Sequence, residues 1–182
     1  LNVLNTSDRN IITVEDPIEA VIPGVTQIEV KDDIGLSFDK VLRHVLRQDP
    51  DIILAGEIRD KESAQVAFQA ALTGHLVLST IHTNNSLDVA SRIQEFGISP
   101  NVFSNAMIGV IAQRLIRAVC KHCRKTRIPE GLEKMRIAEA LGSDSIPDAV
   151  NEATGCTACH NTGYLGRIPI IELWRNDRNT AK

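Results

Sequence analysis

Short apolar segments alternate with segments of helical periodicity over the first hundred residues, and this alternation constrains the fold more than any other feature. The apolar runs that predict strands occupy residues 10–14, 25–30, 51–55 and 75–80. Apolar residues at helical spacing fill three further segments, 36–48, 61–74 and 86–97. Strands that alternate with helices in this way are typical of an α/β fold with right-handed crossovers. The sequence therefore predicts an α/β fold whose sheet is predominantly parallel.

Residues at the ends of the predicted helices support these assignments. Gly74 and Gly97 are placed to end the second and third helices, and Ser86 is placed as the N-cap of the third. The segment 100–119 is largely apolar and begins with a proline, which is allowed in the first turn of a helix. We therefore expect one long apolar helix over 100–119.

Charge and aromatic content argue against nucleic acid as the main partner. The 182 residues carry 20 basic and 23 acidic side chains, a net charge of −3, with only one Trp, one Tyr and four Phe. Binding sites for single-stranded nucleic acid rely on aromatic stacking platforms. The longest near-apolar run, "AMIGVIA", is far shorter than the roughly 20 residues of a membrane-spanning helix. The basic segment 114–127 leaves zinc-dependent nucleic-acid binding as a minor alternative.

The cysteines predict a structural metal site. They form two C-x₂-C pairs separated by 32 residues: Cys120, Cys123, Cys156 and Cys159. Four thiolates complete a closed tetrahedral Zn²⁺ site that leaves no position for water. In a sequence that shows no secretory signal, a metal site is favoured over disulfides. The alternatives are two unpaired surface hairpins, or a ligand role for His122 or His160, which lie inside or beside the pairs.

Polar side chains follow three of the predicted strands where each strand ends. The strand at 10–14 is followed by Glu15 and Asp16, the strand at 51–55 is followed by the segment 56–59, and the strand at 75–80 runs into the segment 79–84. Because ligands of parallel sheets bind beyond the carboxyl ends of the strands, all three groups are expected at one edge.

The mixture of residue types at this edge fits phosphoryl transfer. Carboxylates can orient an attacking water and position Mg²⁺, arginines can neutralise the charge on the transferred group, and a histidine or threonine can sense the γ-phosphate. Each group also has a simpler interpretation. Glu15 and Asp16 before Pro17 could form a polar turn. Arg43 and Arg47, one helical turn apart, could belong to a solvated helix face.

Four long segments together resemble a known family. They are "ITVEDPIE", "LRHVLRQDPDIILAGEIRD", "ALTGHLVLSTIHTN" and "AQRLIR". In this order, they resemble the bacterial ATPases that power type II secretion and type IV pilus assembly, and the resemblance runs from about Asn10 to Trp174. The cysteine pairs point to the assembly and secretion branch, because the related retraction ATPases typically lack them.

The resemblance implies roles for individual residues. Glu15, Asp16 and Glu19 match the family's aspartate box, next to the metal and the attacking water. The segment 54–60 matches the Walker B motif, in which Glu57 acts on Mg²⁺ and water and Gly56 stands where many other nucleotidases carry an aspartate.

The resemblance also implies residues that respond to the nucleotide. The segment 73–84 matches the histidine box, in which His75 and His82 link the nucleotide state to conformation, with Thr80 and His82 at the nucleotide. Three arginines look like those that approach a phosphate across a subunit boundary: Arg43, Arg47 and Arg59.

For the chain as a whole, the resemblance implies a partial RecA-like P-loop NTPase core at 1–119, truncated at its N-terminal end, a zinc subdomain at 120–166 and the start of a truncated C-terminal region at 167–182. Its implied cofactors are ATP, Mg²⁺ and a structural Zn²⁺. Family members form hexameric rings at the cytoplasmic face of the inner membrane. They act there on membrane-embedded platform proteins, without direct contact to nucleic acid and without spanning the membrane.

One element of such an enzyme is missing from the sequence. The loop G-x-x-x-x-G-K-[S/T] holds the nucleotide phosphates, but none of the 11 glycines is followed by lysine. The chain also begins at Leu1 instead of methionine, so we expect a fragment of a longer ATPase that by itself cannot hold ATP tightly. The alternative is a non-catalytic, zinc-stabilised interaction module with a degenerate NTPase core.

Overall fold

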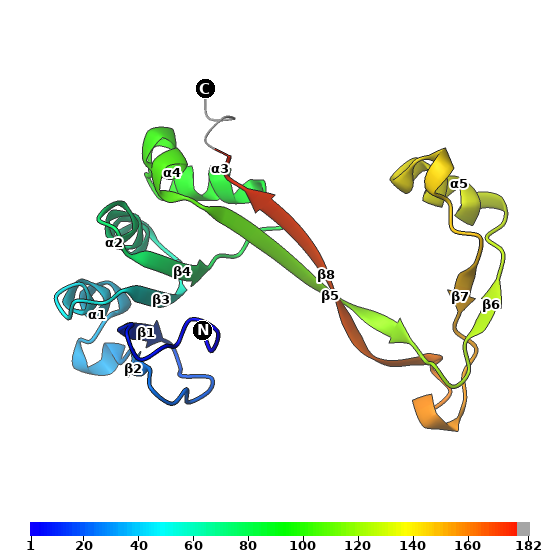
Figure 1. Ribbon diagram of the computed structural model, residues 1–182, viewed down its shortest axis with the longest axis horizontal. Coiled ribbons are helices and arrows are strands. Elements are labelled where there is room, and N and C mark those ends of the chain that lie inside the picture. Colours follow the sequence, from blue (N-terminus) through cyan, green and yellow to red (C-terminus); the bar gives the residue numbers. More distant parts are fainter. Residues whose placement is uncertain (178–182) are drawn as a thin grey trace. The chain divides into compact units, whose positions relative to one another are not determined.

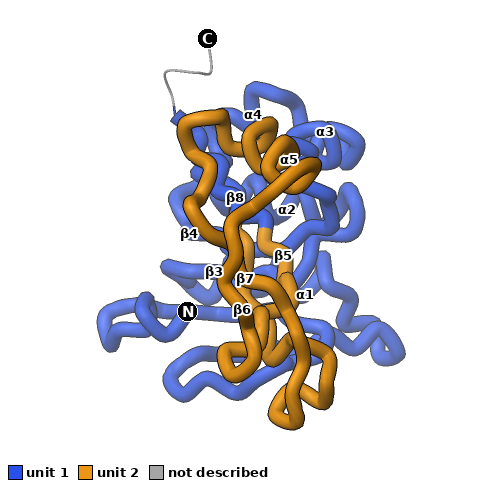
Figure 2. The backbone as a smooth tube through the Cα atoms, turned by 90° about the vertical axis from the view of Figure 1, so that its right-hand side faces the viewer, with its two compact units in different colours: residues 1–112, 172–182 blue, residues 113–171 orange. Residues whose placement is uncertain are grey.

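The computed structural model describes residues 1–177 and divides into two compact units (Figure 2). The first unit comprises residues 1–112 and the chain from 172 onward, and the second comprises residues 113–171. The last five residues of the predicted C-terminal region, 178–182, lie outside the described residues. Among the described residues, no helix is long and apolar enough to cross a membrane.

The first unit is built on a four-stranded sheet with the order β2-β1-β3-β4 (Figure 1). Its strands are β1 (Ile11–Glu15), β2 (Thr26–Glu29), β3 (Ile52–Glu57) and β4 (Leu76–Thr80). Every pairing between them is parallel. The predicted parallel α/β fold is therefore confirmed, and the carboxyl ends of all four strands lie at the same edge.

Helices cover this sheet and bury its apolar side chains. They are α1 (Phe38–Val45), α2 (Lys61–Leu72), α3 (Asp88–Glu95) and α4 (Pro100–Ala106). The core includes Val14, Leu42 and Ile53, each fully buried. Asp60 caps the start of α2 by accepting a hydrogen bond from the Ser63 backbone N–H at 2.7 Å. Because α2 follows β3 directly, this cap holds the end of β3 at the edge of the sheet.

The helix ends agree with the predictions at two glycines and differ at one serine. Gly74 and Gly97 have φ values of 108° and 81°, the left-handed region that suits glycine after a helix. The N-cap assignment of Ser86 is wrong, because α3 begins at Asp88 and its N-cap residue is Leu87. Before the helix, Asn85 Oδ1 accepts from the backbone N–H groups of Leu87 and Asp88. Ser86 is buried and instead donates to Glu172.

The long helix predicted over 100–119 is also wrong. The helix α4 ends at Ala106, and Gly109–Val119 forms the strand β5. The backbone of Met107 is extended, and a Cβ on Gly109 would lie 2.8 Å from the carbonyl O of Trp174. The segment holds several β-branched residues, which favour strands. An apolar run of this kind does not distinguish helix from strand by periodicity alone.

The strand β5 pairs with β8 (Tyr164–Arg175) in a two-stranded sheet. Side chains near the end of β8 pack within the first unit. The ring of Trp174 stacks on Phe103, with centroids 6.0 Å apart, and Phe103 stacks on Phe68 at 6.2 Å. Asn176 Nδ2 donates to the carbonyl O of Ser104 at 2.7 Å. This contact is why the C-terminal part of the described chain belongs to the first unit.

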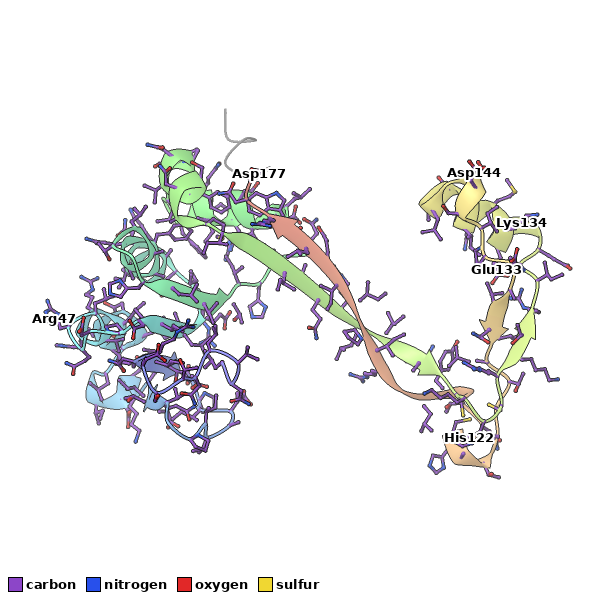
Figure 3. The ribbon with its side chains drawn as sticks, viewed as in Figure 1. Arg47, His122, Glu133, Lys134, Asp144 and Asp177 are labelled. Atoms are coloured by element: carbon purple, nitrogen blue, oxygen red, sulfur yellow. The ribbon has the colours of Figure 1, made fainter. Side chains whose placement is uncertain are left out.

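The second unit contains the antiparallel strands β6 (Lys125–Arg127) and β7 (Val150–Glu152), with α5 (Gly131–Leu141) between them in sequence. Glu133, on α5, pairs with Arg127 at 2.6 Å and so ties the helix to β6 (Figure 3). The guanidinium carbon of Arg117 lies 4.1 Å from the ring centroid of Tyr164.

Candidate functional site

A cavity of about 710 Å³ lies at the carboxyl edge of the sheet in the first unit. The ends of β1, β3 and β4 and the start of α1 contribute to its walls. Its lining is strongly acidic, with seven residues that we call the cavity carboxylates: Glu15, Asp16, Glu19, Asp32, Asp39, Glu57 and Asp60. Arg59 is the basic residue of this lining. The cavity thus has the charge of a site for cations.

Most of the residues predicted for the site meet at this cavity. Seven of them line it: Glu15, Asp16, Glu19, Gly56, Glu57, Arg59 and Thr80. An eighth, His82, contacts the Glu57 carboxylate through Nε2, at 2.9 Å from Oε1. They come together because β3 lies between β1 and β4 in the sheet. Polar residues that follow these three parallel strands must therefore be neighbours.

Gly56 allows β3 to approach β1 closely. The register between β3 and β4 shifts between Ala55 and Glu57. The carbonyl O of Gly56 accepts a hydrogen bond from Thr80 Oγ1 at 2.8 Å. A Cβ on Gly56 would lie 3.0 Å from the carbonyl O of Val14. The carboxylate that other nucleotidases carry at the matching position would have to displace this backbone, so packing explains the glycine.

The Glu57 carboxylate is in contact with two side chains, Arg59 and His82. Arg59 Nε donates to Glu57 Oε2 at 2.7 Å, and Arg59 Nη1 also lies 3.4 Å from Oδ2 of Asp16. Its hydrogen bond to Glu57 is the main cause that raises the pKa of Arg59 above its ordinary value. The Glu57 side chain is only 20% exposed, whereas those of Arg59 and His82 are 61% and 92% exposed. The Glu57 carboxylate therefore lies at the cavity wall, and its two partners, Arg59 and His82, extend from it toward solvent.

Glu15 is held by two side chains that the sequence did not indicate. Thr13 Oγ1 and Gln27 Nε2 both donate to Glu15 Oε1, at 2.5 Å and 2.9 Å. Partial burial raises the pKa of Glu15, but hydrogen bonds from Thr13, Gln27 and the Glu19 backbone outweigh it and leave the pKa below its ordinary value. Glu15 is therefore a fixed, ionised carboxylate near neutral pH.

Three cavity carboxylates were not predicted: Asp32, Asp39 and Asp60. Asp60 serves as the cap of α2, and Asp39 pairs with Arg43 at 3.6 Å. A hydrogen bond from Ser37 is the main cause that lowers the pKa of Asp39. Asp39 lies in the first turn of α1 and reaches the cavity because of the path of the loop before this helix, which the sequence does not indicate.

Three predicted residues lie away from the cavity lining. Arg43 is exposed on α1, and Arg47 is exposed just after it (labelled in Figure 3). Arg47 Nη1 donates to the carbonyl O of Arg43 at 2.9 Å. His75 precedes β4, so it lies at the opposite end of that strand from Thr80. Five residues of extended chain place the two about 16 Å apart. His75 Nδ1 lies 2.9 Å from the carbonyl O of Ala70, at the end of α2.

In the second unit, the sulfur atoms of Cys120, Cys123, Cys156 and Cys159 all lie within 4.8 Å of one another. Neighbouring sulfurs are 3.8, 3.9 and 4.0 Å apart. A Zn–S bond of about 2.3 Å in a tetrahedron requires sulfurs about 3.8 Å apart. None of the four forms a disulfide. The arrangement therefore fits a tetrahedral Zn²⁺ site.

Backbone groups around the cysteines support this interpretation. N–H groups of Gly155, Cys156 and Gly163 donate to cysteine sulfurs at 3.2–3.3 Å, which favours thiolates. Gly163 has φ of 76°, and a Cβ there would lie 2.7 Å from that of Ala153, so the turn requires glycine. His122 is exposed on the loop between the first two cysteines (Figure 3), outside the group of four sulfurs.

Comparison with known proteins gives a consistent result. The family model described as type II/IV secretion system protein matches residues 1–182. Type II secretion system protein E of Pectobacterium carotovorum subsp. carotovorum is 46% identical over 173 residues, which cover 95% of this chain. The type IV pilus assembly ATPase PilB of Thermus thermophilus is 47% identical over 177 residues, again 95% of the chain. The chain spans 34% of the length of the first relative and 19% of the second.

Among solved structures, the pilus retraction motor PilT, crystallised with bound ADP, matches with a TM-score of 0.68 and 30% identity. The match covers 99% of this chain and 43% of that one. The similarity in structure therefore extends over both units.

Proposed function

Since this chain belongs to the type II/IV secretion system protein family, we propose that it is part of an ATP-hydrolysing motor for secretion or pilus assembly. The observation that carries the proposal is the cavity at the carboxyl edge of the sheet, where the ends of three strands place carboxylates, an arginine and a threonine together. Its relatives are named as secretion proteins and as a pilus assembly ATPase.

In the proposed reaction, the Glu57 carboxylate orients the attacking water and accepts its proton. Glu15 and Asp16 are the residues that would hold a hydrated metal ion. A bound Mg²⁺ would neutralise charge on the nucleotide phosphates. Glu57 is suited to its role because its carboxylate is held at the cavity wall by Arg59. Arg59 can exchange its contact with Asp16 for a phosphate at modest cost, because both of these side chains are exposed and ion pairs between exposed groups are weak.

His82 and Thr80 have roles that follow from their positions. Thr80 links the ends of β3 and β4 through its hydrogen bond to Gly56. His82, in contact with Glu57, begins the segment that leads to α3. We infer that a change at Glu57 on hydrolysis is passed through His82 to that segment. In this way, the nucleotide state would reach the rest of the motor.

The cavity supplies carboxylates but little positive charge, so it forms one half of a nucleotide site. The phosphate-binding loop, which none of the 182 residues provides by sequence, would come from another part of the longer protein. Arg43 on α1 and Arg47 just after it are exposed and available to a phosphate bound by a neighbouring subunit of a hexameric ring. In this proposal, the ring acts at the cytoplasmic face of the inner membrane on a membrane-embedded platform.

The second unit is proposed to hold a structural zinc ion. All four positions of the tetrahedron are filled by cysteine, so the site offers no place for a reacting water. The metal would stabilise the fold of this unit. The unit would then present a rigid surface to the platform proteins. Zinc therefore has no part in the proposed hydrolysis of ATP.

Phosphate release by the complete protein tests the proposed function. The purified protein is expected to hydrolyse ATP in the presence of Mg²⁺ and to lose this activity when EDTA is added. A chain that hydrolyses no ATP, but still binds zinc and a protein partner, would support the non-catalytic interaction module and contradict the proposal. Measurement with and without membrane-platform proteins would show whether they stimulate the rate.

A further inference from the structure

Gln27, on β2, makes three hydrogen bonds that together connect a catalytic carboxylate to the loop that follows it. Its Nε2 donates to Glu15 Oε1 at 2.9 Å and to the carbonyl O of Ala20 at 3.0 Å. Its Oε1 accepts from the backbone N–H of Ile22 at 2.7 Å. The side chain is half-buried. Ordinary strand formation needs none of these side-chain bonds.

These contacts use the donors and the acceptor of the amide group in one orientation only. A glutamine amide has two N–H donors and one carbonyl oxygen. Here both donors meet acceptors, and the oxygen meets a donor. A flipped amide would place its oxygen against two other oxygens, so Gln27 has a single favourable orientation. A glutamate of the same size would face the same repulsion.

The loop fastened by Gln27 belongs to the cavity. It follows β1 and carries Asp16 and Glu19, which both line the cavity. Two of its backbone groups, at Ala20 and Ile22, are bound by the Gln27 amide. Thr13, the register partner of Gln27 on the neighbouring strand, donates to the same Glu15 oxygen. The carboxylate and the loop are therefore held to β2 as one unit.

We propose that Gln27 is a positioning residue for the reaction: it orients the Glu15 carboxylate and fixes the loop that bears Asp16 and Glu19. This role rests on the proposed ATPase function and adds to it a residue that does not itself face the nucleotide. A carboxylate that must bind a metal hydrate in one direction loses rate when it can rotate, because catalysis by positioning depends on small displacements.

Two variants of the complete protein test this role. Gln27→Glu keeps the size of the side chain but replaces the two N–H donors with an acceptor oxygen. Gln27→Met keeps the length of the side chain and removes the N–H donors. In both, kcat for ATP hydrolysis is expected to fall by about ten- to a hundredfold, as for the loss of a hydrogen bond to a charged group. KM for ATP is expected to stay within about threefold, because the lost interaction acts on the transition state and not on ATP binding. Gln94→Glu, at an exposed position on α3, is the matched control and should behave as the wild type.

Three outcomes would overturn the proposal. An active wild type whose two Gln27 variants match it in kcat would show that Gln27 does not position Glu15. Variants that only melt at lower temperature, with the wild-type kcat for the folded fraction, would show a purely structural role. A wild type that does not hydrolyse ATP would overturn the proposed function, and the positioning role with it.

Discussion

The Glu57→Gln variant of the complete protein is expected to hydrolyse ATP about a hundredfold or more slowly than the wild type, with ATP affinity within a few fold. Glutamine keeps the size of the side chain but cannot accept the proton of the attacking water, and a positioned general base contributes about 10²- to 10⁴-fold. ATP affinity changes little because most of the binding comes from the phosphate loop. Phosphate release and equilibrium binding of a fluorescent ATP analogue measure the two quantities separately.

The matched control for this variant is Asp33→Asn. Asp33 is an exposed acid in the short turn Asp32–Ile34 and is not part of the cavity lining, so the same loss of charge should leave hydrolysis unchanged. Near wild-type turnover of Glu57→Gln would remove Glu57 from the catalytic role. An equal loss in both variants would indicate a general effect of charge and would also contradict the assignment.

The Cys120→Ser variant is expected to lose its bound zinc and much of the stability of the second unit. Cys120 is fully buried among the other three sulfurs, so serine leaves an incomplete metal site within a small unit. Structural zinc contributes roughly 10–16 kcal/mol of apparent binding energy in small domains. Metal analysis should give one zinc per chain in the wild type and little in the variant. Thermal unfolding should show an earlier transition.

His122→Ala serves as the control for the zinc site, because His122 is exposed beside the cysteines but lies outside their cluster. It should keep a full equivalent of zinc and the wild-type melting temperature. Two results would contradict the structural role: a wild-type protein without metal, or a zinc-free Cys120→Ser variant that unfolds at the same temperature as the wild type. Zinc lost from His122→Ala would instead assign the histidine as a ligand.

The parts of the fold that follow from local periodicity could be predicted from the sequence. The four strands of the sheet and the helices α1, α2 and α3 were found from the spacing of apolar residues. The segment after Pro100 was not. Its strand β5 pairs with β8, which begins 45 residues after β5 ends, and the sequence of 109–119 alone does not report that pairing. Ser86 was misassigned for the same reason, since its partner is Glu172.

The candidate site shows the same division between local and distant information. Glu15, Glu57 and Thr80 could be placed together because residues that end neighbouring parallel strands share one edge. Gln27 could not, because its role depends on the register of β2 against β1, which sets Thr13 opposite Gln27. Asp39 reaches the cavity through the loop that leads into α1. Contacts that depend on strand register or on the path of a loop cannot be predicted from the local pattern of a single sequence.

The position of the bound metal decides whether the cavity at the carboxyl edge of the sheet is the site of ATP hydrolysis. Crystals of the complete protein with Mn²⁺ and a non-hydrolysable ATP analogue would show the metal by its anomalous scattering. We expect the Mn²⁺ peak inside this cavity, reached by Glu15, Asp16 or Glu57 directly or through one water, with the terminal phosphate beside it. A nucleotide and metal bound elsewhere, with the cavity filled only by solvent, would contradict it.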